Sequence, residues 1–241
     1  MPRFFQDFPG GEAARVTGQD AVHIRRALRM KPGENLTLCD GRGNDYFCEV
    51  AGFEGEDVLL KVLYRTPTAC EPSVAVTLYQ GLPKGEKMEW ILQKAVELGV
   101  SAVVPVAMAR SVVRLEGKEE RRRARWQKIA DEAAGQSGRG ILPAVEAPHT
   151  WRRAMERLQA DGAPVIAFYE GGGQPLARLV ERGARRLAVF VGPEGGFEPA
   201  EIGELQALGA QVATLGPRIL RCETAPLAAL SVIMALTGNM E

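Results

Sequence analysis

The segment LAVFVGPEGGFEPAEIGELQALGAQVATLG (187–216) contains a complete strand–helix–strand unit. Two short apolar runs, at 187–192 and 211–216, flank an amphipathic run at 199–208 that opens with a proline. Strands joined through a helix pair in parallel, because only a crossover of that length brings the chain back to the same end of the sheet. The segment therefore predicts a parallel α/β sheet with helices on both faces.

The same alternation continues in both directions from this unit. Strands are expected at 74–80, 102–106 and 165–170, and helices at 87–98, 121–136, 151–158 and from Thr224 onward. This pattern predicts one α/β domain over residues 74–241.

Residues 1–70 have a different pattern. Short β-rich runs, NLTL (35–38), YFCEV (46–50) and VLLKVL (58–63), are separated by turn signals, and HIRRALRM (23–30) is typical of a short helix. Such spacing favours a small antiparallel barrel or meander. We therefore expect a β-rich domain over 1–70, joined to the α/β domain by a proline-containing linker at 66–73.

Composition excludes several classes of protein. The chain has 241 residues, 46% of them hydrophobic, which is enough for a sizeable core. Thirty basic and thirty acidic side chains argue against binding nucleic acid by bulk charge alone. The apolar stretch at 225–238 is shorter than the ~20 residues that span a bilayer. The N-terminus lacks the apolar core of a signal peptide, which indicates a cytoplasmic protein with no membrane association.

The four cysteines are widely spaced, with no CxxC motif and no neighbouring histidine. This spacing predicts reduced, mostly buried thiols and no metal site.

Three loops that follow predicted strands are rich in glycine or proline, and ligands of α/β sheets bind at such loops. They are GGGQP (171–175), GPEGGF (192–197) and LGPRILR (215–221). No GxGxxG follows a strand and no GxxxxGK[ST] occurs. A dinucleotide-binding oxidoreductase and a P-loop NTPase are therefore disfavoured.

Two of these loops belong to long signatures, VFVGPEGGFEPAEI (189–202) and LGPRILRCETAPLAAL (215–230). Together they resemble the SPOUT superfamily of methyltransferases, and more narrowly the bacterial family that methylates N3 of a uridine in 16S ribosomal RNA. The resemblance covers nearly the whole chain, including LPKGEKMEWILQKAVELGV (82–100), ARSVVR (109–114) and RWQKIADEAAGQSGR (125–139). One departure is visible, because Cys222 stands where the family pattern has Thr.

The resemblance implies a SPOUT-type trefoil-knot α/β domain that binds S-adenosyl-L-methionine, preceded by a small PUA-like β-barrel that helps to bind RNA. It also implies a homodimer with cofactor sites near the subunit interface, so part of the last helix should be buried between two chains. The cofactor-binding residues that it points to are Phe168, Tyr169, Gly192, Pro193, Glu194, Gly195, Gly196, Leu215, Gly216, Ile219 and Leu220. Apolar walls with exposed backbone groups suit a neutral adenine, although Leu215, Ile219 and Leu220 also fit a simple core role.

Methylation of a uracil nitrogen sets its own demands. N3 becomes nucleophilic only after its proton is lost, and the resulting charge spreads onto O2 and O4. Arg221 is our candidate for stabilising this anion and Glu223 for accepting the proton, with Arg218 beside them. Capping of the last helix is an equally good interpretation of Glu223, and bracing of the loop is the favoured interpretation of Glu194.

The expected RNA surface rests on local charge. Residues 110–139 contain nine basic and five acidic side chains. The candidate RNA-binding residues are Arg3, Arg25, Arg29, Lys84, Lys87 and Arg110, and for each an ordinary solvated charge is the alternative. The expected partner is 16S ribosomal RNA or the small ribosomal subunit. A SPOUT enzyme acting on a ribose 2'-hydroxyl and a non-catalytic RNA-binding protein remain the alternative functions.

Overall fold

The computed structural model describes residues 1–113 and 117–241, and the chain divides into two compact units. Unit 1 contains Met1–Glu71 and Ala134–Leu142, and unit 2 contains Pro72–Ala133 and Pro143–Glu241. Arg114, the last residue of the ARSVVR motif, and Glu116, which counts in the local charge, lie outside the described residues.

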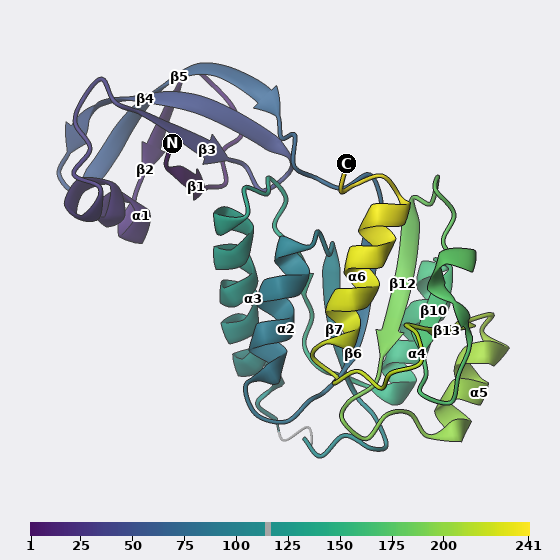
Figure 1. Cartoon of the computed structure of the whole chain (residues 1–241). Helices are drawn as coiled ribbons and strands as arrows, with labels where there is room; N and C mark the ends of the chain where they lie inside the picture. Colours follow the sequence, from purple (N-terminus) through teal and green to yellow (C-terminus); the bar gives the residue numbers. More distant parts are fainter. Residues whose placement is uncertain (114–116) are drawn as a thin grey trace. The chain divides into compact units, whose positions relative to one another are not determined.

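Unit 1 is a five-stranded sheet with strand order β1-β3-β4-β5-β2 (Figure 1). Its elements are β1 (Arg3–Phe5), β2 (Ala13–Val16), α1 (Gly18–Val22), the π-helix η1 (His23–Ala27), β3 (Asn35–Cys39), β4 (Asn44–Glu54) and β5 (Asp57–Pro67). One face of the sheet packs around Ile24, Leu36, Leu38 and Val50, all without exposed surface. The expected β-rich domain is therefore present.

Unit 1 differs from the sequence prediction in two respects. The runs at 35–63 pair antiparallel as expected, but the structure adds an unpredicted strand, β1, which pairs with β3 in parallel. The predicted single helix over 23–30 begins earlier, at Gly18, and ends in a π-turn at Ala27. Both pieces are too short for hydrophobic periodicity to define them.

Unit 2 is an eight-stranded sheet in which every pair of strands is parallel. Its strands are β6 (Ala75–Gly81), β7 (Ala102–Ala107), β8 (Ala144–Val145), β9 (His149–Thr150), β10 (Val165–Phe168), β11 (Gln174–Pro175), β12 (Arg186–Val191) and β13 (Gln211–Thr214). The order is β11-β13-β10-β12-β6-β7-β8, with β9 paired to β7. The predicted parallel α/β sheet is confirmed.

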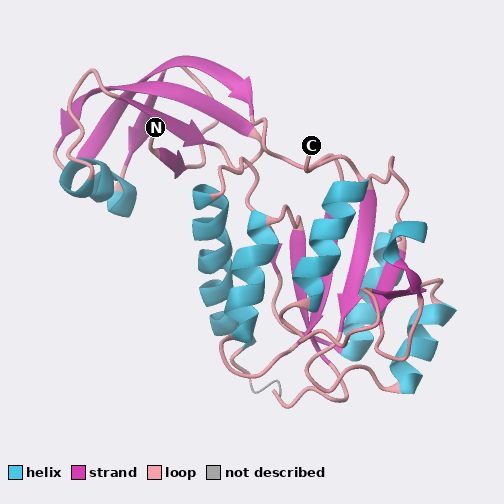
Figure 2. Cartoon of the chain, viewed as in Figure 1, coloured by secondary structure: helices cyan, strands magenta, loops and turns pink. Residues whose placement is uncertain are grey.

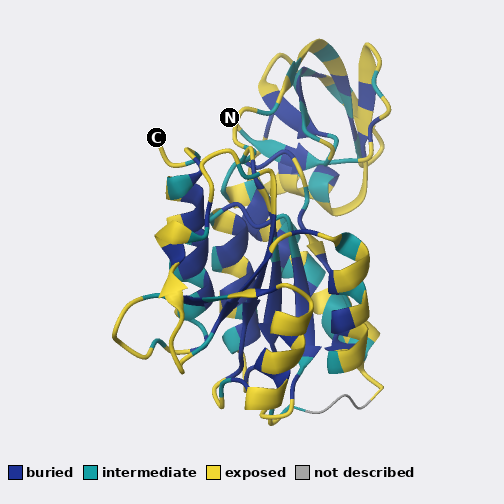
Figure 3. Cartoon of the chain, turned by 90° about the vertical axis from the view of Figure 1, so that its right-hand side faces the viewer, coloured by how far each residue is buried: buried dark blue, intermediate teal, exposed yellow. Residues whose placement is uncertain are grey.

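Helices cover both faces of this sheet, as Figures 1 and 2 show. They are α2 (Lys87–Glu97), α3 (Glu119–Gln136), α4 (Trp151–Asp161), the short η2 (Leu176–Arg178), α5 (Pro199–Ala207) and α6 (Ala225–Leu236). α2, α3 and α6 lie on one face, while α4 and α5 lie on the other (Figure 1). The central strands are buried between the two layers (Figure 3).

The helices of unit 2 begin and end at residues that favour those boundaries. Thr150 caps α4 by accepting a hydrogen bond from the Arg153 N–H, and Gly162 ends the helix in the left-handed conformation. Pro199 opens α5, where Glu198 and Glu201 form a reciprocal capping box. No helix in the described part of the chain is long and apolar enough to cross a membrane.

Candidate functional site

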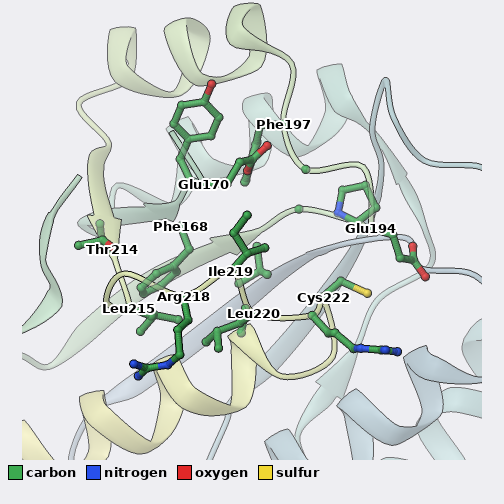
Figure 4. A pocket seen from close by; sticks show the side chains of 18 of the residues that line it. Phe168, Glu170, Glu194, Phe197, Thr214, Leu215, Arg218, Ile219, Leu220 and Cys222 are labelled. Carbon is green, nitrogen blue, oxygen red and sulfur yellow. The ribbon is translucent and has the colours of Figure 1, made fainter. Parts of the chain in front are cut away.

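A cavity of about 510 Å³ opens at the carboxyl ends of β10, β12 and β13 (Figure 4). Three segments form most of its wall: 168–170 after β10, 191–197 after β12, and 213–222 after β13. Lys87 of α2 and Ala225 of α6 complete the lining. Parallel strands place their carboxyl ends at one edge of the sheet, which explains why loops distant in sequence meet here.

The loop after β12 is held in a tight turn. Gly196 has φ +67, and a Cβ at this position would lie 2.1 Å from Oε1 of Glu170. On the β6 side, a Cβ on Gly81 would lie 2.5 Å from the Pro193 nitrogen. The buried Gln80 amide also donates a 3.3 Å hydrogen bond to the Gly192 carbonyl. Glycine is therefore favoured at 196 by the left-handed backbone and required at 81 by the close approach of the Pro193 backbone.

The segment after β13 supplies an apolar wall. Thr214 starts it with a small turn, because its hydroxyl accepts a 3.2 Å hydrogen bond from the Gly216 N–H. Leu215 and Leu220 are partly buried, whereas Ile219 is 88% exposed although it lines the cavity. Ile219 therefore adds exposed apolar surface at the cavity.

Two arginines on this segment, Arg218 and Arg221, also line the cavity. Both are exposed, and neither side chain has a hydrogen-bond or ion-pair partner among the described residues. A guanidinium with all of its donors available can bind a carbonyl oxygen or a phosphate.

A charged cluster joins the loop after β12 to the segment after β13. Lys87 Nζ lies 2.9 Å from Oε1 of Glu194 and 3.2 Å from Oε2 of Glu223. The hydrogen bond to Glu194 is the main reason why the pKa of Lys87 rises to about 12. Burial opposes ionisation of Glu223, but hydrogen bonds from Cys222, its own N–H and Lys87 outweigh that cost and lower its pKa. Both carboxylates therefore stay ionised at neutral pH.

Cys222 is buried against this cluster and lies 3.2 Å from the Glu223 carboxylate, to which it donates. The pKa of Cys222 is raised to about 12, mainly by burial and next by the hydrogen bond to Glu223. The thiol is therefore neutral at physiological pH and serves as a weak donor.

A second group of charges borders the cavity. The Arg110 Nε donates to Glu198 at 2.8 Å, and its Nη1 donates to the Gly195 carbonyl at 2.9 Å. Glu170, whose carboxylate lines the cavity, lies 3.9 Å from the same guanidinium. Arg110 therefore braces the loop after β12 from outside.

All of the cofactor-binding residues predicted from sequence line this one cavity, and so do the candidate catalytic residues Arg218 and Arg221. Glu223 is not one of the residues that line the cavity, and its carboxylate lies in the charged cluster with Lys87. Of the candidate RNA contacts, Lys87 lines the cavity, Arg110 braces its rim, and the Lys84 N–H donates to Glu194.

The three candidate RNA contacts of unit 1 lie in different surroundings. Arg3 is largely buried in an ion pair with Asp45, Arg25 lies over the Phe53 ring, and Arg29 is exposed at a left-handed position with φ 52.

Several lining residues were not predicted, among them Glu170, Thr214, Pro217 and Phe197. Each directly adjoins a predicted residue in the chain, so extending the glycine-loop argument to whole strand ends would have found them. Among the described residues, no three His, Cys, Asp or Glu side chains form a group that could hold a metal ion.

The residues present fit S-adenosylmethionine. The cavity volume lies within the range of small-molecule sites, roughly 300–1,000 Å³. Phe168, Leu215 and Leu220 offer apolar surface for an adenine, and the glycines of the loop at 192–196 let a ligand approach the backbone closely.

Comparison with known proteins gives two family matches. Residues 70–234 match the family model described as an RNA methyltransferase domain, and residues 16–63 match an RNA methyltransferase PUA domain. The first match covers more than half of the chain.

Curated relatives and solved structures agree with these matches. The chain is 39% identical to ribosomal RNA small subunit methyltransferase E of Bacillus subtilis, over 97% of this chain and 96% of the relative. It is 33% identical to the Mycobacterium bovis protein of the same name, over 96% and 89%. The crystal structure of ribosomal RNA small subunit methyltransferase E from Neisseria gonorrhoeae bound to S-adenosylmethionine superposes with a TM-score of 0.87 at 33% identity, covering 98% of both chains.

Proposed function

Because the chain belongs to the RNA methyltransferase family, we propose that it transfers a methyl group from S-adenosylmethionine to N3 of one uridine in 16S ribosomal RNA. One observation carries this function. The two loops that close the cavity belong to a chain that aligns over nearly its full length with small subunit methyltransferases, one of them solved with S-adenosylmethionine. The SPOUT-type knotted α/β domain and the PUA-like domain follow from the same membership.

The cofactor supplies an electrophilic methyl group carried on a sulfonium sulfur. Residues 192–196 and 215–220 would hold it, with Phe168 and Tyr169 beside the adenine. The chain's remaining task is to prepare the uracil.

Arg221 would donate to a uracil carbonyl oxygen, where negative charge develops once the imide proton is lost. Its guanidinium suits this role, since it has no partner among the described residues. Arg218, three residues earlier on the same segment, would add a second donor. Glu223 would accept the imide proton through a water molecule, because its lowered pKa keeps the carboxylate ionised at neutral pH.

The RNA substrate would contact both domains, whose boundaries we place at 1–70 and 74–241, apart from residues 134–142, which belong to unit 1. Arg25 and Arg29 of the β-domain and Lys84 of the α/β domain are the leading phosphate contacts, whereas Arg110 is already engaged by Glu198 and Glu170. Their contribution should appear as salt dependence, because each phosphate contact releases counterions. A salt-independent affinity for a 16S fragment would contradict this assignment.

We further propose that the enzyme is a cytoplasmic homodimer. The outward face of α6 supports the dimer, because Ala228 and Ser231 are only partly buried and Val232 and Ala235 are exposed. Ile219, at the cavity, adds more uncovered apolar surface. Sedimentation at micromolar concentration should show the dimer, and a strictly monomeric profile would contradict it.

The deciding experiment is mass-spectrometric mapping of ribosomal RNA nucleosides in cells with and without the protein. We expect the deletion to remove one N3-methyluridine from 16S RNA, and the wild-type gene to restore it. The Arg221→Met gene, expressed to the same level, should fail to restore it. Loss of a 2'-O-methylated nucleoside instead would assign the enzyme to ribose methylation. An unchanged nucleoside profile would favour a non-catalytic RNA-binding protein.

A further inference from the structure

Lys87 is in contact with both walls of the cofactor cavity. It is the first residue of α2, and its Nζ bridges Glu194, from the loop after β12, and Glu223, from the segment after β13. We propose that Lys87 is a positioning residue that holds these two walls together in the conformation that binds S-adenosylmethionine. This inference rests on the proposed function.

The bridge has no substitute in the described part of the chain. β13 ends at Thr214, and no other hydrogen bond or ion pair joins residues 215–223 to residues 192–196 among the described residues. Glu194 is itself fixed, since its Oε1 accepts a 3.1 Å hydrogen bond from the Lys84 N–H. Lys87 therefore links the segment after β13 to the Glu194 carboxylate, which the Lys84 N–H already holds in place.

Charge balance strengthens the argument. One ammonium lies between two carboxylates, so the cluster has a net charge of about −1 when all three groups are ionised, which is their state at neutral pH. Without Lys87, Glu194 and Glu223 would repel each other and separate the two walls. The remaining neighbour, Cys222, is a neutral thiol and does not replace the lost charge.

The same balance argues against Lys87 as an RNA contact. A phosphate approaching this ammonium would meet two carboxylates that already engage it and outnumber it. An ammonium that binds a phosphate backbone needs uncompensated positive charge. The two interpretations of Lys87 therefore predict different defects when the side chain is removed.

The test compares Lys87→Met with Lys94→Met. Lys94 lies on the same helix, pairs with Glu97 and does not line the cavity, so it controls for loss of one lysine from α2. Calorimetry with S-adenosylmethionine and no RNA measures the cofactor affinity. Filter binding of a 16S fragment at several salt concentrations measures the number of phosphate contacts.

We expect Lys87→Met to weaken cofactor binding about tenfold, the scale of coupling between neighbouring charged groups, and to leave the salt slope for RNA unchanged. Lys94→Met should alter neither quantity. Lys87→Arg should recover most of the affinity, because a guanidinium can also bridge two carboxylates. Glu223→Gln should weaken the cofactor too, and the double variant Lys87→Met/Glu223→Gln should lose less than the sum of the two single effects.

Two results would overturn the inference, and they are distinguishable. If Lys87→Met keeps a cofactor affinity within twofold of wild type and lowers the salt slope of RNA binding by about one, Lys87 is a phosphate contact. Absence of cofactor binding by the wild-type chain would refute the proposed function itself, and the inference with it.

Discussion

Arginines serve different purposes in the two units. In unit 1, Arg139 is 3% exposed, its Nη2 lies 2.8 Å from Glu71, and Arg3 pairs with Asp45 at 2.7 Å. In unit 2, Arg218 and Arg221 line a cavity, are exposed and have no side-chain partner among the described residues. The same residue type is thus part of the structure at Arg3 and Arg139 and open to a ligand at Arg218 and Arg221.

The difference shows how to separate structural charges from functional ones. A buried ion pair is costly to break, because removing one partner leaves the other charged group without water or a counterion. An exposed arginine beside a cavity contributes little to stability, so its presence there is explained by what it binds. Removing members of the two groups should therefore produce opposite defects.

The largest expected effect is on catalysis. Arg221→Met should lower kcat/KM about 10²- to 10³-fold, as expected for loss of a donor to developing negative charge. The melting temperature should stay within about 1 °C, because a solvated side chain is removed. Methylation kinetics on small subunits measure the first quantity. Arg182→Met is the control, because Arg182 is exposed and pairs with the exposed Glu241. A large fall in stability would place Arg221 with the structural arginines.

Arg139→Met should show the opposite behaviour. Loss of its ion pair with Glu71 should destabilise unit 1 by about 3–5 kcal/mol, measured by urea unfolding. Replacing Glu71 as well, in Arg139→Met/Glu71→Gln, should recover part of this loss.

The Glu71 pair also predicts a pH dependence. Burial opposes ionisation of Glu71, but hydrogen bonds and charge from Arg139 outweigh it and hold its pKa below the usual range. The resulting stability is present above the unfolded-state pKa of about 4.3 and is lost as pH falls through the folded-state value. Wild type should therefore lose stability below about pH 4.3, and the part due to Glu71 should be smaller in the Arg139→Met variant, where only the Gly140 and Ile141 N–H groups still lower the Glu71 pKa. An identical pH profile in both proteins would contradict the pairing.

Glu201 is a structural charge inside unit 2. This buried carboxylate accepts from the Glu198 N–H at the start of α5 and from the Ala109 N–H of the loop after β7. Glu201→Ala should cost about 1–2 kcal/mol, which is the scale of a lost helix cap. Urea unfolding measures this loss of stability. The exposed Glu204 of the same helix is unsuitable as a control, because its carboxylate accepts a hydrogen bond from Trp151. Unchanged stability would show that the capping box is dispensable.

Cys222 should give the smallest effect. Cys222→Thr exchanges a weak donor for a hydroxyl facing Glu223, and kcat should change less than threefold. Cys222→Val, which keeps the shape and removes the donor, should raise the pKa of Glu223 toward its usual value. The pH dependence of methylation measures this shift. A large loss with Thr would show that the sulfur has a specific role.

The sequence predicts unit 2 well because its elements are long and regular. Strands 102–106 and 187–192 and helices 87–98 and 199–208 agree with the structure to within one or two residues. The glycine signatures likewise locate the cavity, since parallel strands bring their carboxyl ends together.

The sequence does not predict contacts that depend on tertiary structure. The strand at Arg3–Phe5 is too short for a periodic signal, and its parallel pairing depends on a partner more than thirty residues away. Lys87 has the pattern of an exposed helix residue, and only the fold brings Glu194 and Glu223 to it. His149 is buried in β9 with Glu146 3.0 Å from its Nε2, a contact that depends on the fold in the same way.

Unit 1 is completed by residues that the chain supplies late. The Arg139 carbonyl accepts from Arg3, and Glu71 accepts from the N–H groups of Gly140 and Ile141. During synthesis the five strands would leave the ribosome well before residues 134–142, at about 5–20 residues per second. For several seconds the nascent β-domain would expose the site that Arg139 later fills. A fragment ending at residue 70 would remain in that state permanently, so heterologous expression of the RNA-binding domain needs the later segment as well.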